Sequence, residues 1–208
     1  GIRDDLVTGV QTCALPILQQ NGYLPLDGTV HTVSVSNIGD GTGMMAEIAK
    51  LDLQYKGNQG SAPPSLIAKF ASQNPTNREI ATAYNLYERE TRFLSELDPL
   101  TDVQTPVTYL SVLDGDRFLI LMEDLTDYDV GSQVVGATLS ESELAIDQLV
   151  KLHAPFWGKV DSIDWVPHIA NSYHADNMQS LASVGAAGLI EKFGDYLTPL
   201  YIEHQARI

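Results

Sequence analysis

The spacing of apolar residues changes halfway along this chain, and that change constrains the fold more than any other feature. Between about residues 30 and 71, apolar and polar residues alternate, which is the period of a strand with one buried face. Turn residues of the Gly, Asp and Pro types break this alternation, so it predicts three antiparallel strands. The alternating apolar residues are Val33, Val35, Met44, Ala46, Ile48, Leu51, Leu53, Tyr55, Leu66, Ala68 and Phe70.

One helix is predicted after the third of these strands. Thr76 and Glu79 match the capping box, in which a Ser or Thr side chain and a Glu three residues later satisfy the first backbone amides of a helix. Apolar residues then recur at helical spacing from Ile80 to Leu94, and Pro99 ends the pattern.

A hairpin and then a linker are predicted next. Val107–Leu113 and Arg117–Met122 flank an Asp-Gly-Asp turn, which is typical of two antiparallel strands joined by a tight turn. The acidic stretch from residue 124 to 136 predicts a solvated linker. The first half of the chain is therefore expected to hold five strands and one helix.

The remainder of the chain has helical spacing. Ser140 and Glu143 repeat the capping-box pattern, and the helix that they begin carries His153 and Trp157 on its apolar face. A last helix is predicted at about residues 189–204, close to the final residue. Within this pattern, a histidine on an apolar helix face predicts a packed core residue.

Composition excludes several classes of protein. The 208 residues include 12 basic and 27 acidic side chains, and a net charge of −15 repels a nucleic-acid backbone. The longest apolar run, Phe118–Met122, is far shorter than the roughly 20 residues that cross a bilayer. A single cysteine, Cys13, fits a reducing, cytoplasmic location. The sequence thus predicts neither nucleic acid nor a membrane as partner, and it does not indicate an oligomeric state.

Residues 1–17 resemble translated sequencing-adapter sequence and are expected to be a non-native extension, whereas the plain alternative is a flexible native terminus. The predicted division is then 1–17, a nucleotide-binding lobe at 18–124, and a linker with helices at 125–208. No change in charge marks the second boundary; the change in apolar period does.

Five residues of the first half could carry chemistry. Gly39, Gly41 and Gly43 lie between the first two predicted strands, Lys69 lies on the third, and Glu90 lies on the helix. This order is that of the kinase-like fold, in which a glycine turn approaches the triphosphate and a strand lysine, held by a helix carboxylate, neutralises it. Glu88 is the rival carboxylate, but the helical period places Glu90 beside the apolar stripe.

Each feature also has a plain alternative. The glycines alone are typical of a hairpin, and an isolated Lys69 or Glu90 would be an ordinary surface residue. Asp127 begins a sequence like a calcium loop, but Thr138 occupies the position where that loop needs a glutamate. The remaining histidines lack zinc-ligand spacing, so no metal site is predicted.

The whole body, roughly residues 30–208, is similar to the family of aminoglycoside phosphotransferases and choline kinases, and most closely resembles its ecdysteroid-kinase-like branch. Four blocks carry the resemblance: the glycine turn; Ser65–Lys69; Tyr87–Phe93; and Phe118–Leu125 followed by Leu152–Trp157. The resemblance implies a protein-kinase-like α+β fold, ATP and Mg²⁺ as cofactors and a small-molecule hydroxyl acceptor. It also implies that the Glu123 carbonyl and the Leu125 amide bind adenine.

The sequence departs from this family at the catalytic loop. The His-Gly-Asp-x-x-x-x-Asn motif, whose Asp receives the hydroxyl proton and whose Asn holds Mg²⁺, does not occur; His174–Asn177 resembles it only superficially. We therefore expect a fragment of an ATP-dependent kinase that is truncated at both ends, has an incomplete helical lobe, contains no catalytic or metal-binding residues and is inactive by itself. A non-catalytic pseudokinase or scaffold is the alternative, and a mixed α+β binding domain is a third reading.

Overall fold

The computed structural model describes residues 16–38, 45–132, 134–168 and 172–204. By its internal contacts the chain forms two compact units, Gly1–Gly158 and Lys159–Ile208, which are described separately below. The predicted glycine turn, residues 39–43, and most of the predicted N-terminal extension lie outside the described residues. The division predicted at 124/125 concerns a change of secondary structure inside the first unit and stays a prediction.

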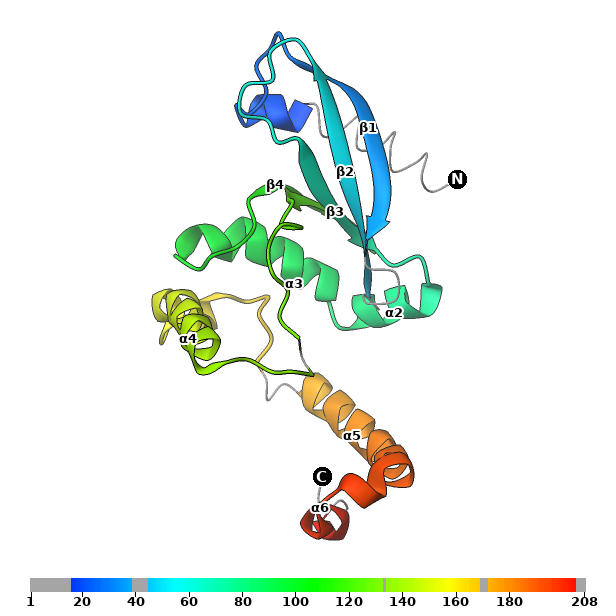
Figure 1. The fold of residues 1–208 in the computed structure, drawn as a ribbon. Coiled ribbons are helices and arrows are strands. Elements are labelled where there is room, and N and C mark those ends of the chain that lie inside the picture. Colours follow the sequence, from blue (N-terminus) through cyan, green and yellow to red (C-terminus); the bar gives the residue numbers. More distant parts are fainter. Residues whose placement is uncertain (1–15, 39–44, 133, 169–171, 205–208) are drawn as a thin grey trace. The chain divides into compact units, whose positions relative to one another are not determined.

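The first unit is built on a five-stranded antiparallel sheet, as the sequence predicts, and the strands follow the order β1-β2-β3-β5-β4 (Figure 1). A short helix at residues 16–20 precedes β1, and the other helices lie between β3 and β4 and after β5. The elements are β1 Thr29–Ile38, β2 Ala46–Lys56, β3 Ser65–Ala71, α2 Pro75–Ala83, α3 Leu86–Arg92, the π-helical turn η1 Phe93–Leu97, the 3-10 turn η2 Asp98–Leu100, β4 Thr108–Asp114, β5 Arg117–Glu123, α4 Leu139–His153, and the 3-10 turn η3 Ala154–Phe156.

The sheet buries apolar side chains on both faces. On one face, Leu51, Leu66 and Leu121 are fully buried against Leu18 and Leu24, which come from the segment before β1. On the other face, a smaller cluster joins the sheet to α2 and α3; it consists of Ala81, Tyr87, Phe118 and Ile120. Burial of the two faces explains why the period-two pattern is so clear in the sequence.

The predicted single helix before the hairpin is wrong in two respects. The chain forms two helices, because Asn85 adopts a left-handed backbone with φ of 51° between α2 and α3. Helix α2 begins two residues earlier than predicted: the Asn74 side chain accepts hydrogen bonds from the Thr76 and Asn77 amides, and Pro75 occupies the first helical position. The predicted Thr76–Glu79 capping box is therefore not formed.

The capping box of α4 is shifted by two residues from the prediction. Thr138 caps the helix and Glu141 completes the box, rather than Ser140 and Glu143. His153, predicted to lie in a core, is exposed, and Trp157 is 83% exposed. Residues 124–132 contain neither helix nor strand, in agreement with the predicted linker.

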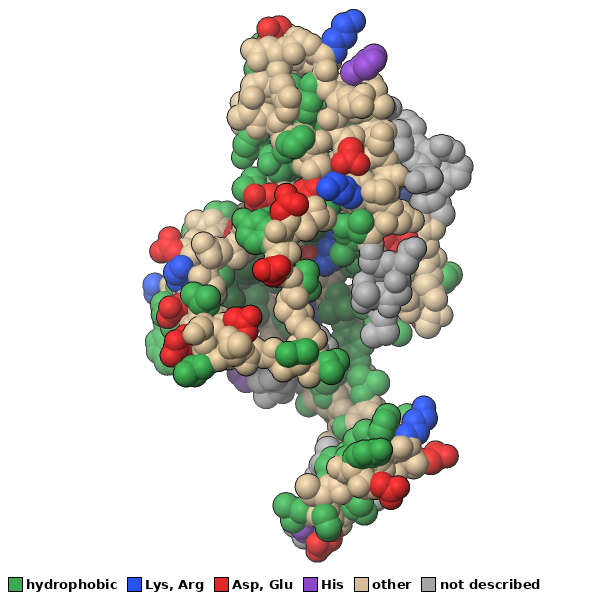
Figure 2. Space-filling model, viewed as in Figure 1, with side chains coloured by type: hydrophobic (Ala, Val, Ile, Leu, Met, Phe, Trp, Pro, Cys, Tyr) green, Lys and Arg blue, Asp and Glu red, His purple; other side chains and the backbone are tan. Residues whose placement is uncertain are grey.

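The second unit contains the 3-10 turn η4 Val160–Ser162, α5 Ser172–Phe193, the 3-10 turn η5 Gly194–Tyr196 and α6 Pro199–His204. The prediction of one helix at 189–204 is thus wrong. Helix α5 begins earlier and ends at Phe193, and α6 begins at Pro199. Figure 2 shows hydrophobic side chains on the surface of α5; Met178, Leu181 and Val184 are among the exposed ones. No helix among the described residues combines the length and apolar character needed to span a membrane.

Candidate functional site

Lys69 of β3 and Glu90 of α3 form the ion pair that the sequence predicts. The Lys69 Nζ lies 2.5 Å from Glu90 Oε1, and the two side chains are 25% and 35% exposed. At that exposure the pair adds little to stability, because water screens both charges. Its value is geometric: it holds a cation at a fixed point on one face of the sheet.

Tyr87 fixes the start of α3 on the sheet. Its ring stacks on Phe118 of β5 with the centroids 4.3 Å apart, and its hydroxyl donates to the Met45 carbonyl at 2.6 Å. The same hydroxyl oxygen accepts from the Ser72 amide at 3.2 Å, just beyond the end of β3. One buried aromatic residue thus joins α3 to three separate parts of the sheet.

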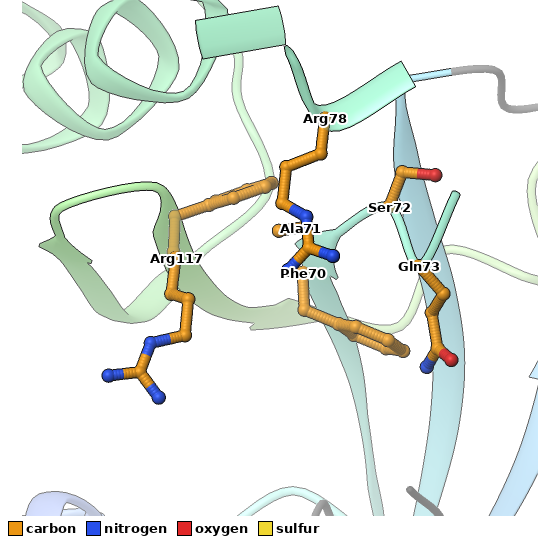
Figure 3. Close-up of a pocket in the computed structure, with 7 residues that line it drawn as sticks. Phe70, Ala71, Ser72, Gln73, Arg78 and Arg117 are labelled. Carbon is orange, nitrogen blue, oxygen red and sulfur yellow. The ribbon is translucent and has the colours of Figure 1, made fainter. Parts of the chain in front are cut away.

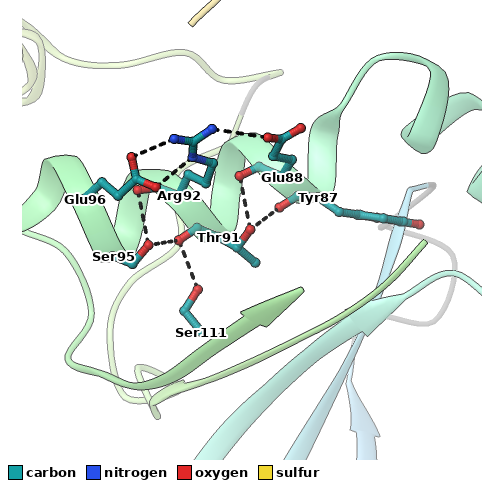
Figure 4. A network of polar contacts seen from close by, with 7 residues as sticks. All are labelled: Tyr87, Glu88, Thr91, Arg92, Ser95, Glu96 and Ser111. Carbon is teal, nitrogen blue, oxygen red and sulfur yellow. Dashed lines mark hydrogen bonds and ion pairs between the residues drawn. The ribbon is translucent and has the colours of Figure 1, made fainter. Parts of the chain in front are cut away.

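Thr91 and Ser111 fix the next turn of α3 (Figure 4). The Ser111 hydroxyl, on β4, donates to the Thr91 carbonyl at 3.1 Å, and the Thr91 hydroxyl donates to the Tyr87 carbonyl at 2.8 Å. Tyr87 and Thr91 are both buried, so Glu90 lies on the half of the helix that faces the sheet. Glu88 pairs instead with Arg92 at 3.3 Å, which confirms the choice of Glu90 as the partner of Lys69.

Glu123 and Leu125, which the family resemblance implies bind adenine, are called the hinge below; Glu123 ends β5 and Leu125 lies two residues beyond it. The Glu123 amide donates to the Val107 carbonyl at 2.8 Å, and the Val107 amide donates to the Glu123 carboxylate at 3.1 Å. The Leu125 carbonyl accepts from the Tyr128 amide at 2.9 Å. Adenine binding by these backbone groups stays a prediction. Gly39, Gly41 and Gly43, which complete the predicted nucleotide site, lie outside the described residues.

A second ion pair on the face that carries Lys69 is absent from the sequence-based prediction. Lys50 of β2 lies 2.7 Å from Asp124, which follows β5 directly. Burial raises the pKa of the Asp124 carboxyl, but hydrogen bonds from Lys50, Ser65 and Thr126 outweigh burial and hold that pKa well below its ordinary value. The sequence signal for this pair was Lys50 itself, which lies within the alternating pattern of β2. A lysine at such a position cannot be told from an ordinary surface lysine by sequence alone.

Cavities lie near this face without including the Lys69–Glu90 pair. One of about 380 Å³ is lined by Phe70, Ala71, Ser72, Gln73, Arg78, Arg117 and Phe118. Figure 3 shows Arg78 extending toward Phe70 while the Arg117 guanidinium points away. A second cavity, of about 500 Å³, is lined by Glu123 and Leu125 together with Asp98 and Tyr128. Among the described residues no group of three or more His, Cys, Asp or Glu side chains could hold a metal ion.

An antiparallel sheet whose third strand carries a lysine paired with a carboxylate of helix α3 is typical of the kinase-like fold. The model of the ecdysteroid kinase-like family matches residues 40–156, which include both members of the pair and the hinge. The chain belongs to the ecdysteroid kinase-like family, and this membership indicates a kinase-like phosphotransferase. Comparison with curated proteins and with solved structures gives no match.

Proposed function

We propose that this chain is the nucleotide-binding part of an ATP-dependent kinase that phosphorylates a hydroxyl group of a small molecule. The Lys69–Glu90 ion pair carries the proposal, because an ammonium held in place beside apolar side chains of the sheet is suited to bind the phosphates of a nucleotide. Ile48 opposes Lys69 in the sheet, and Ile67 precedes it by two residues on the same face. These side chains offer an apolar surface for a base next to the cation.

Each residue has a defined task in this proposal. Lys69 binds phosphate oxygens, Glu90 holds its ammonium in place, and the glycine turn at residues 39–43 lets backbone amides approach the phosphates. The Glu123 carbonyl and the Leu125 amide bind the base. The described residues supply no magnesium site, so no magnesium ligand is proposed among them.

Binding of MgATP to the 208-residue chain tests the proposal, with isothermal titration as the measurement. We expect Lys69→Met to raise the dissociation constant about tenfold or more, because a charge-assisted contact to phosphate is lost. Lys56→Met is the matched control, since Lys56 is an exposed lysine at the far end of β2. Equal affinities of wild type and Lys69→Met would contradict the proposal.

Phosphate transfer separates the kinase from its non-catalytic alternative. The 208-residue sequence lacks the His-Gly-Asp-x-x-x-x-Asn loop, so we expect this chain to bind nucleotide without forming ADP from ATP and any alcohol. A longer chain that supplies this loop should form ADP, and Lys69→Met should abolish most of that activity. ADP formation by the 208-residue chain itself would show that the catalytic residues lie elsewhere, and His174–Asn177 would be examined first.

A further inference from the structure

Three polar residues from three parts of the fold meet around the carboxylate of Asp124. Lys50 comes from β2, Ser65 begins β3, and Asp124 and Thr126 belong to the segment that follows β5. Asp124 Oδ2 accepts from Lys50 Nζ at 2.7 Å and from the Ser65 hydroxyl at 2.6 Å, while Oδ1 accepts from the Thr126 amide at 3.0 Å. Lys50 Nζ also donates to the Thr126 hydroxyl at 3.3 Å. This set is called the Asp124 cluster below.

The Asp124 cluster differs from an ordinary surface ion pair. The Asp124 side chain is only 8% exposed, and both of its oxygens are hydrogen-bonded. A carboxylate at such depth is costly unless it is fully paired, so removal of one partner leaves a charge that the structure cannot tolerate well. By contrast, Asp129, five residues further on, is exposed.

The Asp124 cluster lies on the same sheet face as Lys69. In the pairing of β2 with β3, Lys50 opposes Ile67 and Ile48 opposes Lys69, and Ile67 is two residues from Lys69 on β3. Two residues along a strand correspond to about 7 Å, so a buried isoleucine separates the two lysines. The face thus presents an ion pair, an apolar patch and a second ion pair in sequence.

Each lysine has its own carboxylate, and the two carboxylates come from different places. Glu90 belongs to a helix that is fixed by Tyr87 and Ser111. Asp124 is the first residue after β5, in a stretch that forms neither helix nor strand. Its carboxylate is therefore a link from this segment to β2, in addition to the backbone contact between Glu123 and Val107.

We propose that Asp124 is a positioning residue that, with Lys50 and Ser65, holds the backbone of residues 123–125 against the sheet so that it can bind the base of a nucleotide. This inference rests on the function proposed above and assigns the base, not the phosphates, to the Asp124 cluster. Asp124 pairs with Lys50, so loss of Asp124 would leave the Lys50 ammonium without that carboxylate and available to phosphate. Loss of Asp124 should therefore weaken base recognition and leave phosphate binding intact or stronger.

Two ligands distinguish these contributions: ATP, which has a base, and inorganic tripolyphosphate, which has none. For Asp124→Asn and for Lys50→Met, we expect the ratio of ATP affinity to tripolyphosphate affinity to fall about tenfold, the effect of losing one hydrogen bond to a charged group. Asp129→Asn is the matched control and should keep the wild-type ratio. Lys50→Arg preserves the charge and should restore most of it. A ratio unchanged in both Asp124→Asn and Lys50→Met would overturn the positioning role.

A measurement without nucleotide tests the same link directly. The Thr126 amide donates to Asp124, so its hydrogen exchange should become about tenfold faster in Lys50→Met, whose Asp124 loses its cation. If the Thr126 amide of Lys50→Met exchanges at the wild-type rate, the proposal is overturned. Ser65→Ala removes one hydrogen bond and no charge, and it serves the same test if the charge variants fail to fold. If the wild-type chain binds neither ligand, the proposed function fails and the positioning role with it; an unchanged ratio in a chain that binds ATP overturns the positioning role alone.

Discussion

The sheet and helix α4 belong to one compact unit but are specified in different ways. All buried residues among those described lie between Leu18 and Leu121, in the sheet, the segment before it, the connections that flank β3 and the helices that cover the sheet. Helix α4 has none; its apolar residues Leu144, Ile146 and Val150 are all more than half exposed. Its first turn is instead fixed by the capping box, and Gln148 adds hydrogen bonds to Gln104 in the segment before β4. Apolar burial thus determines the first region, and polar contacts determine the second.

The largest effect should come from leucines of the two regions that undergo the same substitution. Leu66 is fully buried in β3, so Leu66→Ala should lower the free energy of unfolding by about 2 to 5 kcal/mol, through lost burial and the cavity left behind. Leu144→Ala on α4, where the side chain is 64% exposed, should change it by less than about 0.5 kcal/mol. Denaturant unfolding measures both, and equal losses would remove the distinction.

A backbone test sharpens the same comparison within the first region. Gly57 has φ of 85°, and a Cβ there would collide with the Asp27 carbonyl oxygen. Gly115 has φ of 62° in the β4–β5 turn, but a Cβ there meets nothing within 4 Å. Both alanine variants incur the strain of positive φ, and Gly57→Ala should cost about 1 to 3 kcal/mol more because of the collision. Similar unfolding midpoints for the two variants would contradict the close contact between Gly57 and Asp27.

Much of the sheet was predictable because the same apolar alternation recurs in several strands and the motifs follow one another in a characteristic order. Alternation gave the strands, and the order of the glycine turn, lysine and helix carboxylate gave the Lys69–Glu90 pair. Glu90 could be chosen over Glu88 because only one of two residues two positions apart can share the buried side of a helix.

Helix boundaries were less predictable because the local signals overlap. Thr138 with Glu141 and Ser140 with Glu143 both satisfy the capping-box spacing, and the sequence alone does not distinguish them. Asn85 gives no warning comparable to Gly or Pro, although asparagine tolerates the left-handed conformation better than most residues. The Asp124 cluster joins residues up to 76 positions apart, and no local pattern reports such a meeting.

A cap variant tests how locally α4 is specified. Thr138→Ala removes the side chain that accepts from the Glu141 amide and should cost about 1 kcal/mol of local helix stability. Ser140→Ala is the control, because the structure assigns Ser140 no capping role. Hydrogen exchange of the first-turn amides of α4 measures the effect. Faster exchange in Ser140→Ala than in Thr138→Ala would indicate that α4 begins at Ser140, as predicted from the sequence, and not at Thr138.

The last test concerns pH. The folded pKa of Asp124 lies below 3.8, so the stability that it contributes is complete above that value and is lost only as the pH falls through the folded pKa. The difference in unfolding free energy between wild type and Asp124→Asn should therefore stay constant from pH 7 to about pH 5 and shrink below about pH 4. Asp129→Asn should show no such difference. A difference that already shrinks between pH 7 and pH 5 would indicate that Asp124 is not held in its charged form.

The left-handed corner at Asn85 has a mechanical consequence for the Lys69–Glu90 pair. In one straight helix, a tilt at Pro75 would be transmitted along about 22 Å of rigid axis to Glu90. Here the axis ends at Tyr84, and α3 begins afresh on contacts of its own through Tyr87. Movement of α2 therefore reaches Glu90 through the packing of Ala81 against Tyr87, and not along one continuous helix axis.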